Sequence, residues 1–375
     1  MMEKDMRERL NAIIQSAKSS KRYCKQTWVR SFNNVCIYGL GKFFRDVFED
    51  RELKKKLGVN YLSDADQSKW HQMFYGIECV PPEHLKGVKD LVVIVLIGGD
   101  TKEVEKKFKT WNIPYILGYE LLLEMSIHGE INKDDFEKNT ILDVFESINS
   151  ARSKELYVEI LAQRLAPEQS TKTYEELFSP TDYFDQSCYH ITDNEVFVDC
   201  GAYNGDTIKE FLNTVKDFDS IYAFEMEENN YKQLTAYVHT LEEKKRNKIN
   251  CYHAGVWNEK TILTYGNEEK SSKDAFSVLK NRHGVKVEAI KLDNVLSGKK
   301  VTWIKMDIEG AELNALMGAE QIIKSQRPKL AICLYHKIDD FWKIPSYLKS
   351  LVPDYQFKIR HHSNYNFYGT VLYAE

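Results

Sequence analysis

The stretch Val196-Phe-Val-Asp-Cys-Gly-Ala-Tyr-Asn-Gly-Asp-Thr207 decides the fold of the C-terminal half of this chain. Its apolar start predicts a buried strand, a glycine-bearing turn follows, and the residues from Thr207 onward predict a helix. Glycine has no Cβ, so the backbone of such a turn can approach a ligand closely. Open α/β sheets hold nucleotides with a strand, a glycine turn and a helix in this order. The turn contains Gly201 and Gly205 but lacks the three glycines of the full dinucleotide fingerprint.

Two acidic residues accompany the turn. Asp199 ends the predicted strand and is a candidate to hold the amino group of a ligand, while Glu225 ends a second predicted strand, 220–225, and lies 24 residues after Gly201. That spacing suits an acid that accepts hydrogen bonds from ribose hydroxyls. No Lys-Ser/Thr pair for phosphate follows, which favours a nucleoside without phosphates, and S-adenosylmethionine is the common one. The structural alternative is a turn that only packs a helix on a sheet. The residues expected to bind the cofactor here are Asp199, Gly201, Ala202, Tyr203, Asn204, Gly205, Thr207 and Glu225.

A second constellation is Lys305-Met-Asp-Ile-Glu-Gly-Ala-Glu312, where a predicted strand gives way to a helix. Asp307 and Glu309 stand two residues apart and share one face if the strand continues that far. They emerge at the carboxyl edge of the sheet, where ligands bind in open α/β folds. The structural alternative is that Glu309 and Glu312 complement the positive end of a helix, and we favour it for Glu312. It does not explain Asp307, which we interpret as functional.

Histidines provide a third set of candidates. His336 follows the next predicted strand, and its imidazole is a candidate proton acceptor, although a structural histidine is an equal alternative. The pair His361-His362, after Arg360, is a further candidate. Carboxylates near imidazoles also suit a divalent cation. No ligand spacing in the sequence requires one, so no metal is expected.

The composition predicts a globular protein with two cores. The chain has 375 residues, and its net charge of −4 argues against general affinity for nucleic acid. Its seven cysteines form no Cys-x-x-Cys pair, which favours reduced thiols over disulfides or a zinc site. The N-terminus lacks the apolar core of a signal peptide, and the longest apolar run, Leu91 to Ile97, is too short to span a membrane. We therefore expect a soluble cytoplasmic protein.

Four segments are expected along the chain. Residues 1–30 predict helices, 31–130 a small Rossmann-like domain of alternating strands and helices, 131–182 a helical bridge, and 183–375 the domain that carries the motifs above. The Rossmann-like segment has its own glycine turn, Gly39-Leu-Gly41, with Asp64 23 residues beyond Gly41. Phe44 stands where a third small residue is needed, so a purely structural domain is at least as good an interpretation as a second nucleotide site.

The alternation of strands and helices continues to the C-terminus. Strands are predicted at 249–254, 301–306 and 329–335, and an antiparallel hairpin at 355–360 and 369–374. The fold class expected for the whole chain is therefore α/β.

The C-terminal half, from about Tyr183 to Glu375, resembles the FkbM-type S-adenosylmethionine-dependent methyltransferases. The resemblance implies a class I methyltransferase sheet of seven strands, the last antiparallel, preceded by the smaller Rossmann-like domain and the helical bridge. It also implies O-methylation, commonly of sugars or of polyketide-type natural products. Met226 replaces the proline of the family's Phe-Glu-Pro, which alters loop stiffness more than ligand choice. The motifs that carry the resemblance are 198–207, Ala223-Phe-Glu225, Ile290-Lys-Leu-Asp-Asn-Val-Leu296, Ile304-Lys-Met-Asp-Ile-Glu-Gly-Ala-Glu312 and Thr370-Val-Leu-Tyr373.

The expected reaction is methyl transfer to a hydroxyl group of a small-molecule, sugar or glycan acceptor. Asp307 or His336 is expected to remove the hydroxyl proton, and Glu309 to orient the acceptor. By the placement of strand ends in this fold, Ala254 and Gly255 are expected beside the adenine, and Met226 and Asp307 complete the expected cofactor site.

Two other classes stay open. One is a catalytically idle S-adenosylmethionine-binding scaffold in polysaccharide biosynthesis. The other is a nucleotide-sugar or NAD enzyme that acts through the N-terminal domain. The sequence gives neither the acceptor nor the oligomeric state.

Overall fold

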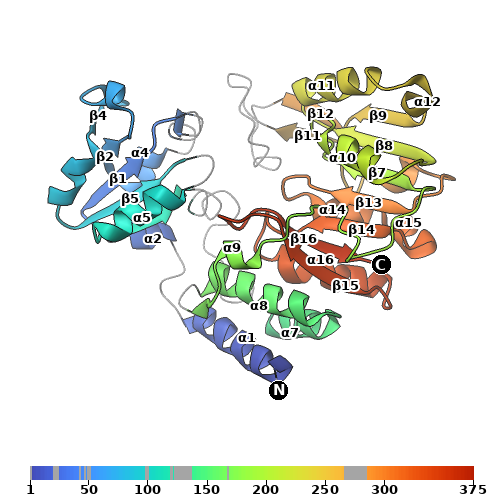
Figure 1. Cartoon of the computed structure of the whole chain (residues 1–375), viewed down its shortest axis with the longest axis horizontal. Coiled ribbons are helices and arrows are strands. Elements are labelled where there is room, and N and C mark those ends of the chain that lie inside the picture. Colours follow the sequence, from blue (N-terminus) through green and yellow to red (C-terminus); the bar gives the residue numbers. More distant parts are fainter. Residues whose placement is uncertain are drawn as a thin grey trace. The chain divides into compact units, whose positions relative to one another are not determined.

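The computed structural model describes residues 2–19, 25–41, 44–45, 48, 52–97, 101–118, 121, 137–166, 169–265 and 285–375. The chain forms two compact units (Figure 1). The large unit combines Met1–Ser16 with Phe136–Glu375, and the small unit is Ala17–Asp135. The chain therefore starts in the large unit, leaves it for the small unit and returns. The boundary expected near residue 130, between the Rossmann-like domain and the helical bridge, lies within 122–136, outside the described residues.

The small unit is built on a six-stranded sheet of order β3-β4-β2-β1-β5-β6. All neighbouring strands are parallel except β3 and β4, which form a hairpin that the sequence analysis did not predict. The strands are β1 (Asn34–Tyr38), β2 (Val59–Ser63), β3 (Met73–Phe74), β4 (Ile77–Val80), β5 (Leu91–Val95) and β6 (Tyr115–Leu117). This is the expected Rossmann-like alternation.

The side chains of a strand alternate between the two faces of a sheet. Both faces of the small sheet therefore carry apolar side chains, and helices cover both. Ile37 belongs to the same buried cluster as Leu57 of α4 (Leu53–Leu57). Its neighbour Tyr38 points to the other face, where its ring meets Phe108 of α5 (Lys102–Thr110) with centroids 5.2 Å apart. The other described helices of the unit are α2 (Lys25–Arg30), η2 (Gln67–Lys69) and η3 (Pro82–Gly87).

The large unit contains a seven-stranded sheet of order β15-β16-β14-β13-β7-β8-β9. Neighbours from β14 to β9 are parallel, whereas β16 runs antiparallel to both β14 and β15. The predicted fold class, a class I methyltransferase sheet with an antiparallel last strand, is confirmed. The strands are β7 (Val196–Cys200), β8 (Ser220–Glu225), β9 (Ile249–His253), β13 (Trp303–Met306), β14 (Lys329–Cys333), β15 (Phe357–His361) and β16 (Thr370–Ala374).

The large unit also contains a smaller sheet of order β10-β12-β11, which the sequence analysis did not predict. Its strands are β10 (Gly255–Val256), β11 (Thr261–Tyr265) and β12 (Val285–Ile290). The helices after β7 are α10 (Asp206–Thr214), α11 (Glu228–His239), α12 (Glu243–Arg246), α13 (Leu292–Val295), α14 (Glu312–Gly318), α15 (Glu320–Gln326) and α16 (Asp340–Leu351).

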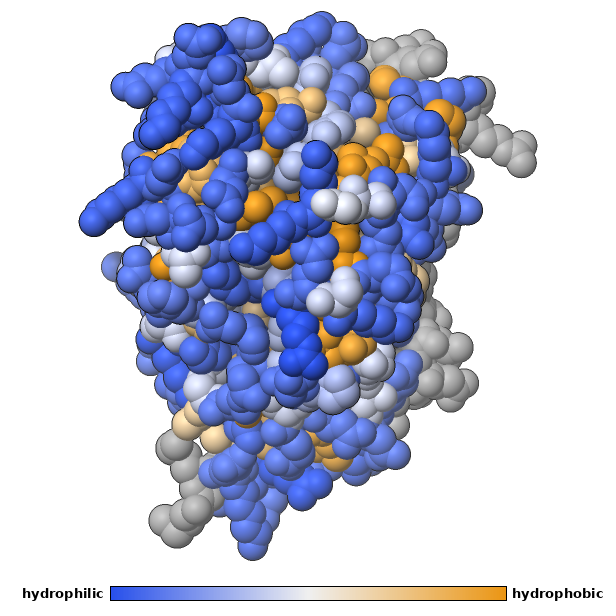
Figure 2. Space-filling view, turned by 90° about the vertical axis from the view of Figure 1, so that its right-hand side faces the viewer, coloured by the Kyte–Doolittle hydropathy of each residue, from blue (hydrophilic) through white to orange (hydrophobic). Residues whose placement is uncertain are grey.

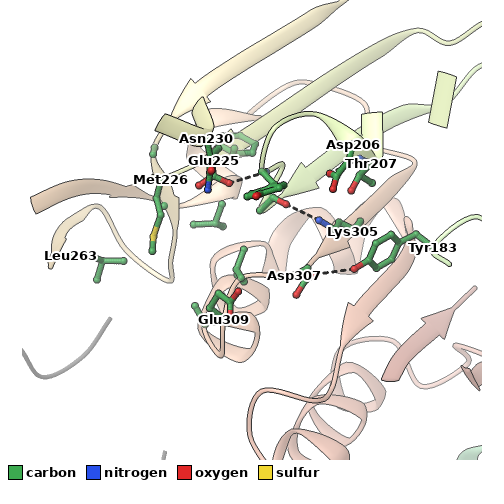
Figure 3. Close-up of a pocket in the computed structure, with 18 of the residues that line it drawn as sticks. Tyr183, Asp206, Thr207, Glu225, Met226, Asn230, Leu263, Lys305, Asp307 and Glu309 are labelled. Atoms are coloured by element: carbon green, nitrogen blue, oxygen red, sulfur yellow. Dashed lines mark hydrogen bonds between the residues drawn. The ribbon is translucent and has the colours of Figure 1, made fainter. Parts of the chain in front are cut away.

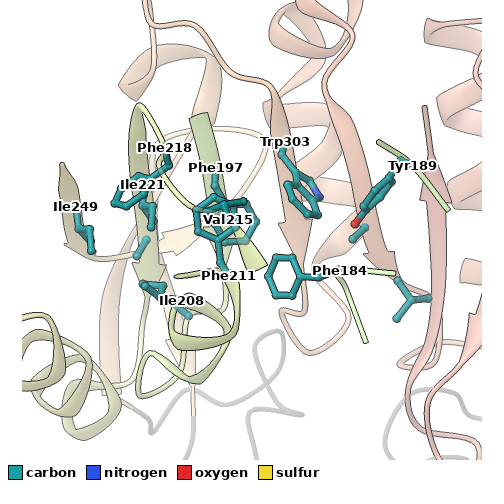
Figure 4. Close-up of a cluster of buried hydrophobic side chains, with 14 of the residues drawn as sticks. Phe184, Tyr189, Phe197, Ile208, Phe211, Val215, Phe218, Ile221, Ile249 and Trp303 are labelled. Atoms are coloured by element: carbon teal, nitrogen blue, oxygen red, sulfur yellow. The ribbon is translucent and has the colours of Figure 1, made fainter. Parts of the chain in front are cut away.

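An aromatic core supports one face of the large sheet (Figure 4). Phe197 of β7 and Phe211 of α10 stack with ring centroids 4.8 Å apart, and Trp303 of β13 lies edge-on to both. Val198 and Ile304, one position further along their strands, point to the opposite face and are fully buried too. Because both faces are covered, the carboxyl edge of the sheet is the place left for a site.

The expected helical bridge consists of α7 (Lys138–Ser147), α8 (Ala151–Leu165) and α9 (Tyr174–Leu177). The backbone N–H of Ile359 in β15 donates to the hydroxyl of Ser153 in α8 at 3.0 Å, so the bridge packs on the sheet edge. The N-terminal helix α1 (Met2–Ser19) joins the same layer, because Arg9 donates to the buried carboxylate of Glu159. The first helix and the bridge therefore belong to the large unit.

The described helices include none with the length and apolar character needed to cross a membrane. On the face shown in Figure 2, hydrophilic side chains predominate. Apolar side chains on this face lie in separate groups rather than in one broad patch.

Candidate functional site

A cavity of about 360 Å³ lies at the carboxyl ends of β7, β8 and β13 (Figure 3). Ligands bind at this edge of open parallel sheets, and the volume is typical of a small-molecule site. The polar side chains that line it are Asp182, Tyr183, Tyr203, Asp206, Thr207, Glu225, Asn230, Lys305, Asp307 and Glu309.

The glycine turn between β7 and α10 forms one wall of the cavity. Gly201 has a φ of +80°, and a Cβ at this position would lie 1.9 Å from the carbonyl oxygen of Asp307. The end of the neighbouring strand therefore requires glycine here, whether or not a ligand is bound. Gly205 has a φ of +89°, and a Cβ there would lie 2.7 Å from the ring of Tyr237 in α11. The second glycine lets α10 begin close to α11.

Glu225 lies at the end of β8 with 7% of its surface exposed. Its two carboxylate oxygens accept hydrogen bonds from the backbone N–H groups of Tyr203, at 2.9 Å, and Glu227, at 2.8 Å. Each oxygen keeps a second lone pair, which is what two adjacent ribose hydroxyls need. Burial raises the pKa of Glu225, and hydroxyl donors from a ligand would favour the charged form again.

Asp199 does not line the cavity, contrary to the expectation that it holds the ligand's amino group. It is fully buried and pairs with Lys305, whose Nζ lies 3.0 Å from its Oδ1. Burial raises the pKa of Asp199 to about 6, against the opposing effect of the Lys305 ammonium. The same Nζ donates to the carbonyl oxygen of Gly201 at 2.8 Å. Asp199 therefore acts on the site indirectly, by holding the lysine that fixes the glycine turn.

Asp307 directly follows β13 and lines the cavity. Its Oδ2 accepts a hydrogen bond from the phenol of Tyr183 at 3.0 Å, and its Oδ1 accepts one from the phenol of Tyr335 at 2.6 Å. Burial by itself would raise the pKa of Asp307, but the cations of His336 and Lys305 and the two phenols hold it below its usual range. Asp307 is therefore an oriented carboxylate at neutral pH.

His336 lies behind the cavity rather than in it, with 1% of its surface exposed. Its Nδ1 is 2.9 Å from the buried carboxylate of Glu312, and its Nε2 is 3.3 Å from Glu309 and 3.5 Å from Asp307. Burial alone would lower the pKa of His336, but the carboxylates of Glu312 and Glu309 raise it well above its ordinary value. A protonated imidazole cannot remove a proton, so the geometry disfavours His336 as the base.

The same cluster has the composition of a metal site. Asp307, Glu312 and His336 bring one ligand atom each to within 4.8 Å of one another. Against the effect of burial, the carboxylates of Glu312 and Glu309 raise the pKa of the imidazole, so the same residues also form a buried ion-pair network. Glu312 also accepts the backbone N–H of Ile308 at 2.9 Å, which agrees with the structural interpretation of that residue.

Several expected cofactor residues shape the turn without reaching the cavity. Ala202 is buried in the core cluster, and Asn204 and Gly205 complete the bend into α10. The expected residues that line the cavity are Gly201, Tyr203, Thr207, Glu225, Met226, Ala254, Gly255, Asp307 and Glu309.

An apolar wall faces the glycine turn across the cavity (Figure 3). Met226 packs against the small sheet together with Leu263, and a Cβ on Gly255 would lie 3.5 Å from Leu263 and 3.8 Å from the sulfur of Met226. This apolar surface lies in the same cavity as Glu225 and suits a purine ring. It lies where the sequence analysis expected the adenine.

Sequence reasoning missed Tyr183, Lys305 and Leu263 as site residues. Leu263 comes from a strand of the unpredicted small sheet, and Tyr183 precedes β7 in irregular structure, where no pattern marked it. Lys305 did give a signal, because a lysine within the apolar strand 301–306 is rarely buried without a partner.

The histidines of the terminal hairpin have structural roles. His361 is fully buried between the hydroxyl of Thr370, at 2.8 Å, and the carbonyl of Asn366, at 2.9 Å, and burial lowers its pKa to about 3. His362 lies 2.8 Å from the carbonyl of Ser179 and 2.7 Å from the phenol of Tyr373. Neither residue lines the cavity.

The sheet order, the antiparallel strand and the cavity at the carboxyl edge define a class I methyltransferase fold. Residues 199–362 match the model of the methyltransferase FkbM domain. This match confirms the resemblance of the C-terminal half to the FkbM-type methyltransferases that was seen in the sequence.

Two solved structures show similarity to the chain. The methyltransferase FkbM from Methylobacillus flagellatus KT is similar with a TM-score of 0.74 and 21% identity, covering 100% of this chain and 99% of that chain. An rRNA methylase from Streptococcus thermophilus gives a TM-score of 0.32 and 15% identity, covering 49% of this chain and 87% of its own. No curated protein matches the chain by sequence. The family supports methyl transfer from S-adenosylmethionine as the general activity of the domain.

Proposed function

We propose that the chain transfers the methyl group of S-adenosylmethionine to a hydroxyl group of a sugar, a glycan or a related natural product. The observation that carries the proposal is the presence of two oriented acids in one cavity. Glu225 has free lone pairs at the end of β8, and Asp307 is held by two phenols at the end of β13. The first suits the nucleoside and the second suits the acceptor.

The lining of the cavity fits the parts of this cofactor. Glu225 provides acceptors for the ribose hydroxyls, and Met226 and Leu263 provide an apolar surface for the adenine. Five carboxylates line the cavity, which favours a positively charged sulfonium. When bound, S-adenosylmethionine supplies an electrophilic methyl group to a correctly aligned nucleophile.

The acidic lining favours a hydroxyl acceptor over an amine. Carboxylates such as Asp307 and Glu309 raise the pKa of a neighbouring amine, which then stays protonated and has no lone pair for attack. A hydroxyl is neutral and donates its hydrogen bond to a carboxylate. When that oxygen takes the methyl group, the carbon–sulfur bond of the sulfonium would break with its electron pair left on sulfur, and the hydroxyl proton would pass to the carboxylate. We assign the proton to Asp307, the orienting hydrogen bond to Glu309, and to His336 the positioning of both.

One observation favours the alternative of an idle scaffold. Both oxygens of Asp307 already accept phenol hydrogen bonds, and its pKa lies below the usual range, so Asp307 is a weak base. Cofactor binding without transfer to any acceptor is the outcome that this alternative requires.

The experiment that tests the proposal is a transfer assay with S-adenosylmethionine carrying a radioactive methyl group and a panel of sugars and glycans. We expect Asp307→Asn to slow transfer by about 10²–10⁴-fold, the contribution of a positioned base, while cofactor affinity measured by calorimetry stays close to the wild type. Asp354→Asn, an exposed acid paired with Arg327, is the matched control and keeps full activity.

The outcomes separate the hypotheses. Full transfer by Asp307→Asn would remove Asp307 from the proton step. Cofactor binding by the wild type with no labelled product would favour the idle scaffold, and absence of cofactor binding would end the proposal. The expected cytoplasmic location and the absence of a nucleic-acid partner stay predictions.

A further inference from the structure

A second cavity, of about 520 Å³, lies beside the first in the large unit. Its described lining comes from two segments only, the stretch 181–187 before β7 and the helix α10. Those segments also line the first cavity, through Asp182 and Tyr183 on one side and Asp206 and Thr207 on the other. The two cavities therefore share these two segments as part of their walls. They lie one after the other along the line where the two segments meet.

The spacing of residues on α10 explains how one helix serves both cavities. Asp206 lines the first cavity, and Glu210, Asn213 and Thr214 line the second. These positions are i, i+4, i+7 and i+8, which lie on one face of an α-helix. The opposite face carries Ile208 and Phe211, which are buried in the core. One polar ridge thus runs along α10 from the cofactor cavity into the second cavity.

The side chains of the second cavity suit a ligand with many hydroxyl groups. The amides of Gln186 and Asn213 have no hydrogen-bond partner among the described residues, so both donors and acceptors are free. Asp185 is held in place, because its carboxylate accepts the backbone N–H of Ser187 at 2.8 Å and lies 3.3 Å from the guanidinium of Arg360. Fixed acceptors and free amides together can satisfy hydroxyls that both donate and accept.

The charges of the two cavities argue against an anionic ligand. Seven carboxylates line them, and among their described lining residues only Lys305 is positive, already paired with Asp199. Burial raises the pKa of Glu210, and the carboxylates of Asp182 and Asp206 raise it further, so the acids of both cavities act on one another. An acceptor with phosphate, sulfate or carboxylate groups and no compensating cation would therefore be repelled from the second cavity.

We propose that the second cavity is an acceptor subsite for an uncharged oligosaccharide. The reacting ring lies at Asp307 and Glu309, and the next ring lies between α10 and the segment 181–187, where Gln186 and Asn213 bind its hydroxyls. The inference rests on the proposed function, since it extends the acceptor of that reaction from one ring to at least two. It also defines the acceptor as neutral.

The test is binding of the labelled full-length protein, saturated with S-adenosylhomocysteine, to an array of neutral, amino, carboxylated and sulfated glycans of one and of several rings. We expect binding to neutral glycans of two or more rings. The double variant Gln186→Ala, Asn213→Ala should lower that binding about tenfold, as the loss of two hydrogen bonds implies. Gln233→Ala, which removes an exposed amide of α11 outside both cavities, is the matched control and should bind as the wild type does.

Three results would overturn the subsite: binding to no glycan, a preference for carboxylated or sulfated glycans, or unchanged binding by the double variant. A further variant tests the charge argument, because Glu210→Lys should gain binding to carboxylated glycans. Calorimetry with S-adenosylmethionine on the same samples separates the two proposals. If the cofactor binds and no glycan does, only the subsite fails, whereas failure of cofactor binding removes the proposed function itself.

Discussion

The two units of this protein each have a glycine turn after the first strand and an acid at the end of the next strand. In the small unit, Oδ2 of Asp64 accepts the backbone N–H of Leu40 at 2.6 Å and the ammonium of Lys69 at 2.8 Å. In the large unit, Glu225 accepts the backbone N–H of Tyr203, and none of the described cations forms an ion pair with it. The same contact between an acid and the backbone therefore occurs in both units. In the small unit the acid is also paired with a lysine, which we call a closed turn, and in the large unit the acid lines a cavity, which we call an open site.

The difference shows that the surroundings of the acid, more than its spacing from the glycines, decide whether a turn can bind a ligand. The Oδ1 of Asp64 accepts the N–H of Asp66 at 2.8 Å, so Asp64 has few lone pairs left. Phe44 is fully buried beside this turn, as its position in the fingerprint suggested. These contacts favour the structural interpretation of the small unit over a second nucleotide site.

The largest expected effect comes from adding one methyl group to each turn. Gly201→Ala places a Cβ 1.9 Å from a backbone oxygen at a φ of +80°, so we expect it to destabilise the large unit by about 3 kcal/mol or more and to abolish cofactor binding. Gly39→Ala has a milder conflict of the same kind, at 2.8 Å from the carbonyl oxygen of Leu96 with a φ of +100°, and should destabilise the small unit only. Urea unfolding and calorimetry measure both. Loss of cofactor binding in Gly39→Ala would contradict the comparison.

The next effect concerns the two acids themselves. We expect Glu225→Ala to weaken S-adenosylmethionine binding roughly 100-fold or more, because two hydrogen bonds to a charged acceptor are lost. Asp64→Ala should leave that affinity unchanged and should not create or remove affinity for NAD, since Asp64 is already paired with Lys69. Calorimetric titration of both variants with both ligands decides this. NAD binding by the wild type that Asp64→Ala abolishes would reverse our interpretation of the small unit.

The sequence predicted the open site well where the signal was local. The turn 201–205 and the acid Glu225 follow from strand ends and spacing, and both line or shape the cavity. The short strands β3, β4 and β10 were missed because two to four residues give no measurable alternation.

The prediction failed where contacts between distant segments decide. Asp199 lies opposite Lys305 in the register of β7 and β13, and a pair of this kind appears only when the strand order is known. The same holds for His336, whose protonation depends on Glu312 and Glu309 from the preceding loop and helix. Sequence alone supplied these residues but not their partners.

The third comparison is between Lys69, which pairs with Asp64 in the small unit, and His336, which lies behind the cavity of the large unit. His336 has a pKa raised well above 6.5 in the folded protein by its carboxylate neighbours, after allowance for burial. The protonated imidazole therefore stabilises the fold to its full extent below about pH 6.5, the pKa of His336 in the unfolded chain. This contribution is lost as the pH rises through the pKa of His336 in the folded protein. Lys69 instead forms an ion pair with Asp64, whose lowered pKa keeps that carboxylate charged near neutral pH. We expect urea unfolding to show that the stability difference between wild type and His336→Gln shrinks from pH 6.5 upward, whereas the difference for Lys69→Gln stays constant near neutral pH. A constant His336 difference would mean that the imidazole is neutral.

The smallest effects should have opposite signs in the two turns. Burial raises the pKa of Asp64, but Lys69 and two backbone N–H groups outweigh it, so this pKa is lowered and the stability from Asp64 is lost only as the pH falls through the folded value. Burial raises the pKa of Glu225, so its folded state binds a proton more tightly, and stability falls as the pH rises from the unfolded value of about 4.3. Relative to the wild type without cofactor, Asp64→Asn should lose most stability near neutral pH, whereas Glu225→Gln should gain stability as the pH rises. Urea unfolding between acid and neutral pH tests this. If the stability of both variants changed in the same direction with pH, the neighbours of Glu225 would compensate its burial as well as those of Asp64 do. The two turns would then not differ in how they stabilise their acids.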